Sequence, residues 1–175
     1  DCTRNMHINV ARGLPLCIPM PDRDGRLACV GAGPSVRDHL DELLDYDEVW
    51  AVNGAYGFLV DNGIVPHGFV AVDPLPGLAE YVKNPHPDTV FYVSALCAPE
   101  VFEALVDRDV QIWFPNGQEV DWPIGAWLVP GGTTALTRCP GLAKMLGWRD
   151  VTIFGCDCSF TTTERYAYGD GKYAE

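Results

Sequence analysis

The sequence contains no long apolar run. No stretch approaches the ~20 consecutive apolar residues that cross a bilayer, and the beginning lacks the basic segment and apolar stretch of a secretory signal. Basic residues are also few, because 12 Lys and Arg stand against 24 Asp and Glu, which gives a net charge of −12. A surface with this balance repels nucleic acid and anionic lipid. We therefore expect a cytoplasmic protein with neither nucleic acid nor membrane among its partners. The sequence is compatible with a homo-oligomer.

Several catalytic and metal-binding motifs are missing as well. The sequence has no nucleophile elbow, no Walker lysine motif, no histidine-based zinc site and no Cys-x-x-Cys pair. Its seven cysteines, an odd number, therefore favour reduced thiols. Cys29 and Cys97 stand in or beside apolar runs, where free cysteine is typically a small buried hydrophobe. Cys156 and Cys158 would place both sulfurs on one face of an extended chain, and we interpret them as structural filler rather than as a redox or metal site.

Short apolar runs, separated by amphipathic stretches, dominate the chain from Leu27 onward. Each run is continuous rather than alternating, which is typical of strands covered on both faces. The runs lie at residues 27–30, 49–52, 69–72, 90–93, 110–114 and 151–154. This pattern predicts a single α/β domain at 27–175, Rossmann-like, with three layers and a mostly parallel sheet. Residues 1–26, with Pro15, Pro19 and Pro21, are predicted to form an irregular lead-in segment.

Apolar residues at helical spacing fall between the predicted strands. They predict helices with core-facing positions within 36–44, 101–106 and 136–146. Pro140-Gly141 predicts a kink or a late start in the last of these. Residues 115–132 are rich in Pro and Gly and predict a long loop, with room for a short strand at 126–129. A loop of this length is often a lid or a substrate wall.

The first strand is followed by a glycine-rich turn that opens a helical pattern. Glycines let the backbone approach a phosphate closely, and the first amides of a helix face an anion. The alternative is a tight turn without a ligand. Because Val36 replaces the third glycine of the dinucleotide fingerprint, and Asn53 stands where an acid is expected, the pattern does not favour NAD. The turn predicts a nucleotide phosphate site at Gly31, Ala32, Gly33, Pro34 and Ser35.

Further polar residues follow the strands at their carboxyl ends, where ligands of open α/β sheets bind. Asn53 follows the second strand and either contacts the ligand or forms a turn. Asp73 follows the third strand and either binds Mg²⁺ beside the phosphates or caps a turn. Asp157 and Ser159 follow the last strand. We predict catalytic roles for Asp73 and Asp157, a magnesium ligand in Asp73, and nucleotide contacts from Asn53 and Ser159.

A second glycine turn precedes the last predicted helix. It runs Pro130-Gly131-Gly132-Thr133-Thr134. The two hydroxyls either cap the helix or form a second site for an anion or an acceptor, facing the first turn. On the second alternative, Gly132, Thr133 and Thr134 belong to the nucleotide site.

The order of these motifs resembles the MptE-like family over about residues 27–168. The resemblance implies a 6-hydroxymethyl-7,8-dihydropterin diphosphokinase type of enzyme, which transfers diphosphate from ATP, or another nucleotide, to a small alcohol with Mg²⁺. The chain departs from the archaeal members where Ala71 replaces an acid before Val72-Asp73. The motif order also resembles bacterial sialyltransferases that use CMP-sugars and motility-associated glycosyltransferases, which implies that Asn53, Thr133 and Thr134 contact a nucleotide-sugar donor. A nucleotide-binding module without catalysis is a third hypothesis.

Overall fold

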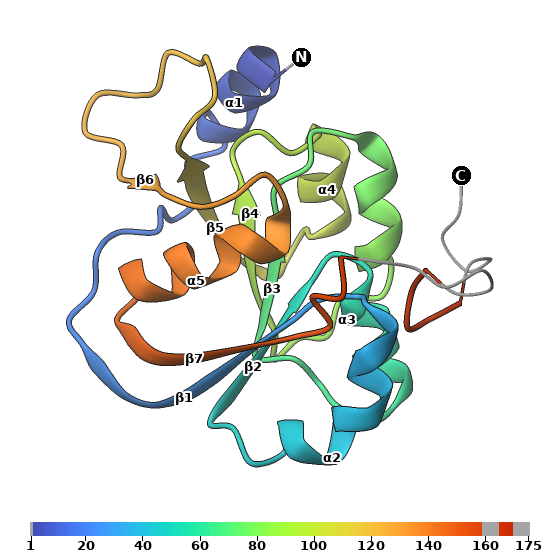
Figure 1. Cartoon of the computed structure of the whole chain (residues 1–175). Coiled ribbons are helices and arrows are strands. Elements are labelled where there is room, and N and C mark those ends of the chain that lie inside the picture. Colours follow the sequence, from blue (N-terminus) through green and yellow to red (C-terminus); the bar gives the residue numbers. More distant parts are fainter. Residues whose placement is uncertain (1, 159–164, 170–175) are drawn as a thin grey trace.

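A computed structural model describes residues 2–158 and 165–169 of the 175-residue chain. Its centre is a seven-stranded sheet in the order β6-β5-β4-β3-β2-β1-β7, in which every neighbouring pair is parallel. Figure 1 shows the strands running beneath α5. The strands are β1 (Arg23–Val30), β2 (Glu48–Val52), β3 (Gly68–Ala71), β4 (Val90–Ser94), β5 (Asp109–Pro115), β6 (Leu128–Val129) and β7 (Trp148–Phe154). The α/β class, the Rossmann-like sheet and all six predicted runs are confirmed.

Helices cover both faces of this sheet. The α-helices are α1 (Cys2–Val10), α2 (Leu40–Leu43), α3 (Ala55–Asp61), α4 (Pro99–Ala104) and α5 (Ala135–Met145), and two 3₁₀ helices are η1 (Pro34–His39) and η2 (Pro76–Val82). The core under α1 to α4, η1 and η2 is separate from the core under α5, and Figure 1 places α5 on the side of the sheet opposite to α2 and α3. The arrangement is therefore three-layered.

The strands are apolar on both sides because both sides are covered. In β1, Ala28 and Val30 point into the core beneath η1 and α2, whereas Leu27 and Cys29 point into the core beneath α5. All four are fully buried. This burial explains why the runs are continuous rather than alternating. Cys29 and Cys97 are both buried, as predicted.

The irregular lead-in predicted for residues 1–26 is wrong in two places. Residues 2–10 form α1, and β1 begins at Arg23 rather than Leu27. Helix α1 is held by buried asparagines, since Asn9 Nδ2 donates to the carbonyl oxygens of Ala95 at 3.0 Å and Cys97 at 2.8 Å. These contacts join residues more than 80 positions apart. The apolar pattern of the segment therefore gave little sign of the helix.

The predicted helices begin and end earlier in the sequence than their apolar patterns suggested. Leu44 and Val106 are 69% and 65% exposed, so their predicted core positions are wrong. Helix α5 begins at Ala135 and continues past Pro140, so a late start is also wrong. Gly141 is required there by packing, because a Cβ at this position would lie 2.1 Å from the carbonyl oxygen of Pro130. The short strand expected at 126–129 is confirmed as β6.

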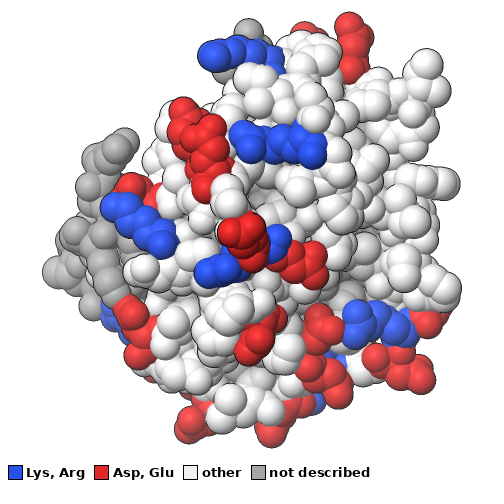
Figure 2. Space-filling model, turned by 180° about the vertical axis from the view of Figure 1, so that it is seen from behind, with Lys and Arg blue, Asp and Glu red and all other residues white. Residues whose placement is uncertain are grey.

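On the face shown in Figure 2, acidic and basic side chains are interspersed, and the basic ones form no continuous stripe. Among the described residues, none of the helices has the length and apolar character needed to span a bilayer.

Candidate functional site

The strand order reverses at β1, which lies between β2 and β7. The chain leaves β1 toward β2 and successive strands on one side, and it returns through α5 to place β7 on the other side. Ligands of open α/β sheets bind at such a reversal, outside the carboxyl ends of the strands. The glycine turn follows β1 at this point, and Asp157 follows β7.

A cavity of about 410 Å³ lies at this reversal, and we call it the switch-point cavity. Four separate parts of the chain contribute to it: the glycine turn, the start of α5, the residues after β7, and the segment at 165–166. Its lining residues are Ala32, Gly33, Thr134, Leu136, Gly155, Cys156, Asp157, Cys158, Arg165 and Tyr166. The fold therefore brings together predicted residues of the first turn, the second turn and the β7 end.

Three backbone amides of the glycine turn already have acceptors. The N–H of Gly31 donates to Phe154 O at 2.8 Å, and that of Gly33 donates to Gly155 O at 3.0 Å. The N–H of Ser35 donates to Asp157 Oδ2 at 2.9 Å, and its hydroxyl donates to the other carboxylate oxygen. The carboxylate of Asp157 thus occupies the place at Ser35 where an anion would bind. The helix that follows is the six-residue 3₁₀ helix η1 rather than a long α-helix.

Close packing alone requires glycine at positions 31 and 33 of the turn. A Cβ on Gly31 would lie 2.4 Å from Leu136 Cδ2 and 2.7 Å from Gly155 O. A Cβ on Gly33 would lie 2.6 Å from Gly155 O and 2.7 Å from Asp157 Cγ. The turn and the β7 end are therefore in direct backbone contact. This contact requires glycine whether or not a phosphate binds.

Asn53 and Asp73 form a second group, at the ends of β2 and β3. Asn53 Nδ2 donates to Asp73 Oδ2 at 2.9 Å, and Asn53 has a left-handed φ of 49°. The Oδ1 atom of Asn53 is buried without a hydrogen-bond partner among the described residues. Neither residue lines the switch-point cavity.

The two predicted catalytic carboxylates lie apart. Asp73 follows β3 and Asp157 follows β7, three strands away, which corresponds to roughly 14 Å at the usual strand spacing. One ion cannot be held directly by both. In the described part of the chain there is no group of three or more His, Cys, Asp or Glu that could hold a metal. Asp73 nevertheless keeps one oxygen beyond its contact with Asn53, which fits a Mg²⁺ ligated mainly by phosphates and water.

Thr134 is the N-cap of α5, as in the capping alternative. Its Oγ1 accepts from the Thr137 N–H at 3.2 Å, and its own N–H donates to Thr137 Oγ1 at 3.1 Å. Gly132 packs on Thr137, because a Cβ at position 132 would lie 2.5 Å from Thr137 Oγ1. Of this second turn only Thr134 lines the switch-point cavity, while Gly132 and Thr133 are exposed outside it. Ser159 lies outside the described residues.

The thiols of Cys156 and Cys158 are exposed at the cavity, so the interpretation as structural filler is wrong. Their sulfurs lie on the same side, 3.9 Å apart, as predicted. The chain is not extended there, however, because Cys158 has a φ of 48°. Slight desolvation at the cavity wall, followed by the contact with Cys158 and the charge of Asp157, raises the pKa of Cys156 although its thiol is exposed. The protonated thiol is therefore favoured at neutral pH.

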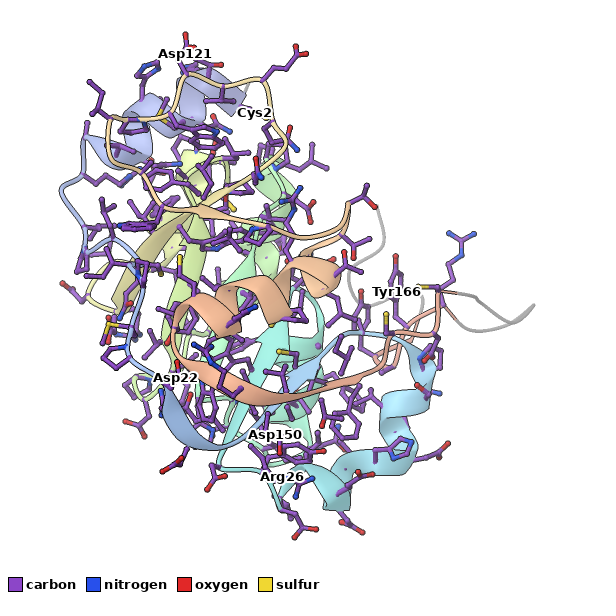
Figure 3. The ribbon with its side chains drawn as sticks, turned by 60° about the vertical axis from the view of Figure 1, so that its left-hand side comes forward. Cys2, Asp22, Arg26, Asp121, Asp150 and Tyr166 are labelled. Carbon is purple, nitrogen blue, oxygen red and sulfur yellow. The ribbon has the colours of Figure 1, made fainter. Side chains whose placement is uncertain are left out.

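The segment at residues 165–169 also lies at this site, although the sequence did not predict it. Its backbone is fixed to the glycine turn, since the Ala167 N–H donates to Ala32 O at 2.8 Å. Arg37 Nε in turn donates to Ala167 O at 2.8 Å. Figure 3 shows Tyr166 beyond the ends of β1 and β7. The only signal in the sequence was the alternation of aromatic residues in Tyr166-Ala167-Tyr168.

Comparisons with known proteins agree with this architecture. A profile of the family described as "6-hydroxymethylpterin diphosphokinase MptE-like" matches residues 21–163. The solved structure of the MAf glycosyltransferase from Magnetospirillum magneticum AMB-1 is similar, with a TM-score of 0.74 and 19% sequence identity. The similarity covers 97% of this chain but 28% of the glycosyltransferase. A search of curated proteins found no match.

Proposed function

This chain belongs to the 6-hydroxymethylpterin diphosphokinase MptE-like family. We propose that it binds a nucleotide in the switch-point cavity and acts as a transferase. One observation carries the proposal. The cavity lies where the strand order reverses, and it combines the glycine turn, the cap of α5, the Arg165 cation and the aromatic ring of Tyr166. In a chain of net charge −12, a cavity that joins a basic side chain, an exchangeable hydrogen-bond site at Ser35 and an aromatic ring suits an anionic nucleotide.

The phosphates of the bound nucleotide replace the Asp157 carboxylate as the hydrogen-bond acceptors of Ser35. In the structure Ser35 donates to both oxygens of this carboxylate, and two oxygens of a phosphate group can accept the same two hydrogen bonds. Once released, Asp157 faces the cavity, where a carboxylate can take the proton from the hydroxyl of an acceptor. Displacement of this kind links donor binding to the availability of the base.

Asp73 and Asn53 lie outside the switch-point cavity, so they would hold magnesium for a nucleotide whose phosphates extend from Ser35 toward the ends of β2 and β3. Mg²⁺ supplies charge neutralisation on the transferred phosphates when it is bound. Asn53 orients the Asp73 carboxylate through Nδ2, and phosphate oxygens and water complete the ligands. The preferred reaction is transfer of diphosphate from ATP, or another nucleoside triphosphate, to a pterin-like or other small alcohol. The alcohol oxygen forms a bond to the β-phosphorus, the bond between this phosphorus and the α–β bridging oxygen breaks, and the nucleoside monophosphate leaves.

A second candidate is glycosyl transfer from a nucleotide sugar of the CMP-sugar type. The similarity in fold to a glycosyltransferase over 97% of this chain favours it. Two further features suit a reaction that needs fewer metal ligands than diphosphate transfer. Ala71 stands where the archaeal diphosphokinases carry an acid, and Asp73 lies far from Asp157.

Thermal-shift measurements with ATP, GTP, CMP and a CMP-sugar, each with and without Mg²⁺, distinguish the two. Stabilisation by ATP that depends on Mg²⁺, and that loses this dependence in Asp73→Asn, supports the diphosphokinase type. Preference for CMP without Mg²⁺ supports the glycosyltransferase. The control is Asp150→Asn, an exposed carboxylate at the opposite end of β7. If no nucleotide stabilises the protein, the proposed function is wrong.

Asp157→Asn tests the exchange at Ser35. The amide keeps an oxygen acceptor for Ser35 but removes the charge that competes with phosphate. We expect nucleotide affinity to stay equal or rise while turnover falls. A parallel loss of affinity would instead mean that Asp157 contacts the donor itself.

A further inference from the structure

Tyr166 presents an aromatic ring at the wall of the switch-point cavity. The residue is 43% exposed, which is unusual for a tyrosine fixed against the body of a protein. Its ring stacks on that of Tyr168, with centroids 5.0 Å apart and an interplanar angle of 10°. One face of Tyr166 is therefore covered by Tyr168, so a ligand that stacks on this ring has to use the opposite face.

The position of this ring is fixed by the fold. Tyr168, which backs it, lies on Gly54, where a Cβ would come within 2.5 Å of the Tyr168 ring. On the other side of the segment, Ala167 donates to Ala32 O, and Arg37 donates to the carbonyl oxygens of Ala167 and Tyr166. The exposed ring is thus held beside the glycine turn by contacts within the protein itself. A fixed ring loses little entropy on binding.

We infer that Tyr166 is the stacking surface for the base of the bound nucleotide, an inference that rests on the proposed function. The phosphate end of the cavity lies at Gly33, Thr134 and Asp157, the residue that Ser35 contacts, and Tyr166 lies next to it through the Ala167–Ala32 contact. A nucleotide that runs from phosphate to base across this cavity brings its planar heterocycle onto the uncovered face of the ring. Stacking of this kind accepts any base, since every base has a π-face.

The stacking role differs from a role of the phenol hydroxyl on phosphate, and substitutions separate the two. Tyr166→Phe keeps the ring and removes the hydroxyl. Tyr166→Leu removes the ring and keeps an apolar side chain. Tyr166→Trp enlarges the ring. Trp127→Leu is a matched control, because Trp127 is an exposed aromatic residue, 57% exposed, beside β6 at the opposite edge of the sheet.

Calorimetric titrations with ATP, CMP, ribose 5-phosphate and inorganic pyrophosphate measure the effect. We expect Tyr166→Leu to weaken ATP or CMP binding roughly tenfold or more and to leave pyrophosphate and ribose 5-phosphate unchanged. Tyr166→Phe, Tyr166→Trp and Trp127→Leu should bind nucleotide like the wild type. In Tyr166→Trp, nucleotide but not pyrophosphate should quench fluorescence beyond the wild-type change, which gives a second readout.

The outcomes separate this inference from the function on which it rests. If the wild type binds no nucleotide, the proposed function fails and takes the stacking role with it. If the wild type binds nucleotide and Tyr166→Leu binds equally well, only the stacking role is overturned. Equal losses in Tyr166→Phe and Tyr166→Leu, or a matching loss of pyrophosphate binding, assign Tyr166 to the phosphate instead.

Discussion

Gly33→Ala is the sharpest test of how the glycine turn is built. Gly33 has a φ of −64° and a ψ of 146°, an extended conformation that alanine adopts freely. The backbone conformation therefore adds no strain, and any cost must come from the new methyl group. That group would lie 2.6 Å from Gly155 O and 2.7 Å from the Asp157 carboxylate.

The neighbouring atoms cannot easily move away. Gly155 has a φ of 63°, and a Cβ on Gly155 would itself lie 2.4 Å from Gly31 O, so the two turns are close on both sides. Overpacking of this kind costs about 1–3 kcal/mol, and we expect the upper half of that range because one contact is with backbone. Part of the cost is the weakening of the hydrogen bonds from Ser35 to Asp157.

Urea denaturation without ligand measures this cost as a fall in the free energy of unfolding. Gly77→Ala is the matched control, since a Cβ on Gly77 meets no atom within 4 Å. An unchanged unfolding midpoint for Gly33→Ala would refute the packing argument. If the cost is found, loss of nucleotide binding in a Gly33 variant is not by itself evidence of phosphate contact, and the variants of Asp157 and Tyr166 become the decisive ones.

Three further predictions concern the thiols and the core. A thiol reagent should modify exposed Cys156 and Cys158 in the native protein, whereas Cys17, at 2% exposure, should react only after unfolding, as mass spectrometry of the labelled protein will report. Burial raises the pKa of Cys17 from 9.0 to about 12, so its contribution to stability is complete below about pH 9 and is lost as the pH rises toward 12. Between pH 8 and pH 10 the free energy of unfolding should therefore fall by about 1.4 kcal/mol more in the wild type than in Cys17→Ala. Equal falls in the two proteins would contradict the raised pKa of Cys17. Gly141→Ala should destabilise by about 1–3 kcal/mol, because its Cβ would lie 2.1 Å from Pro130 O, and a thermal midpoint equal to that of the wild type would disprove this contact.

The sequence by itself determined the elements whose signals are local. Continuous apolar runs predicted the strands because each strand is covered on both faces, and these runs are a property of neighbouring residues. The turn after β1 was visible in the same way, from Gly31 and Gly33 between a strand and a helical pattern. Asn53 and Asp73 could be assigned to one edge of the sheet because parallel strands end on the same side, and the structure brings them into contact.

Only the tertiary structure decided contacts between distant residues. Ser35 and Asp157 are 122 positions apart, and no local pattern indicates that a carboxylate after β7 fills the anion place beside the first turn. The same holds for α1, whose buried asparagines bind carbonyls beyond β4, and for Tyr166, which reaches the cavity through a backbone contact with Ala32. Local propensity and apolar periodicity describe neighbours along the chain, whereas burial and hydrogen bonding across the fold fix which polar groups meet. In this protein they fixed the switch-point cavity, and with it the carboxylate and the aromatic ring that define the candidate site.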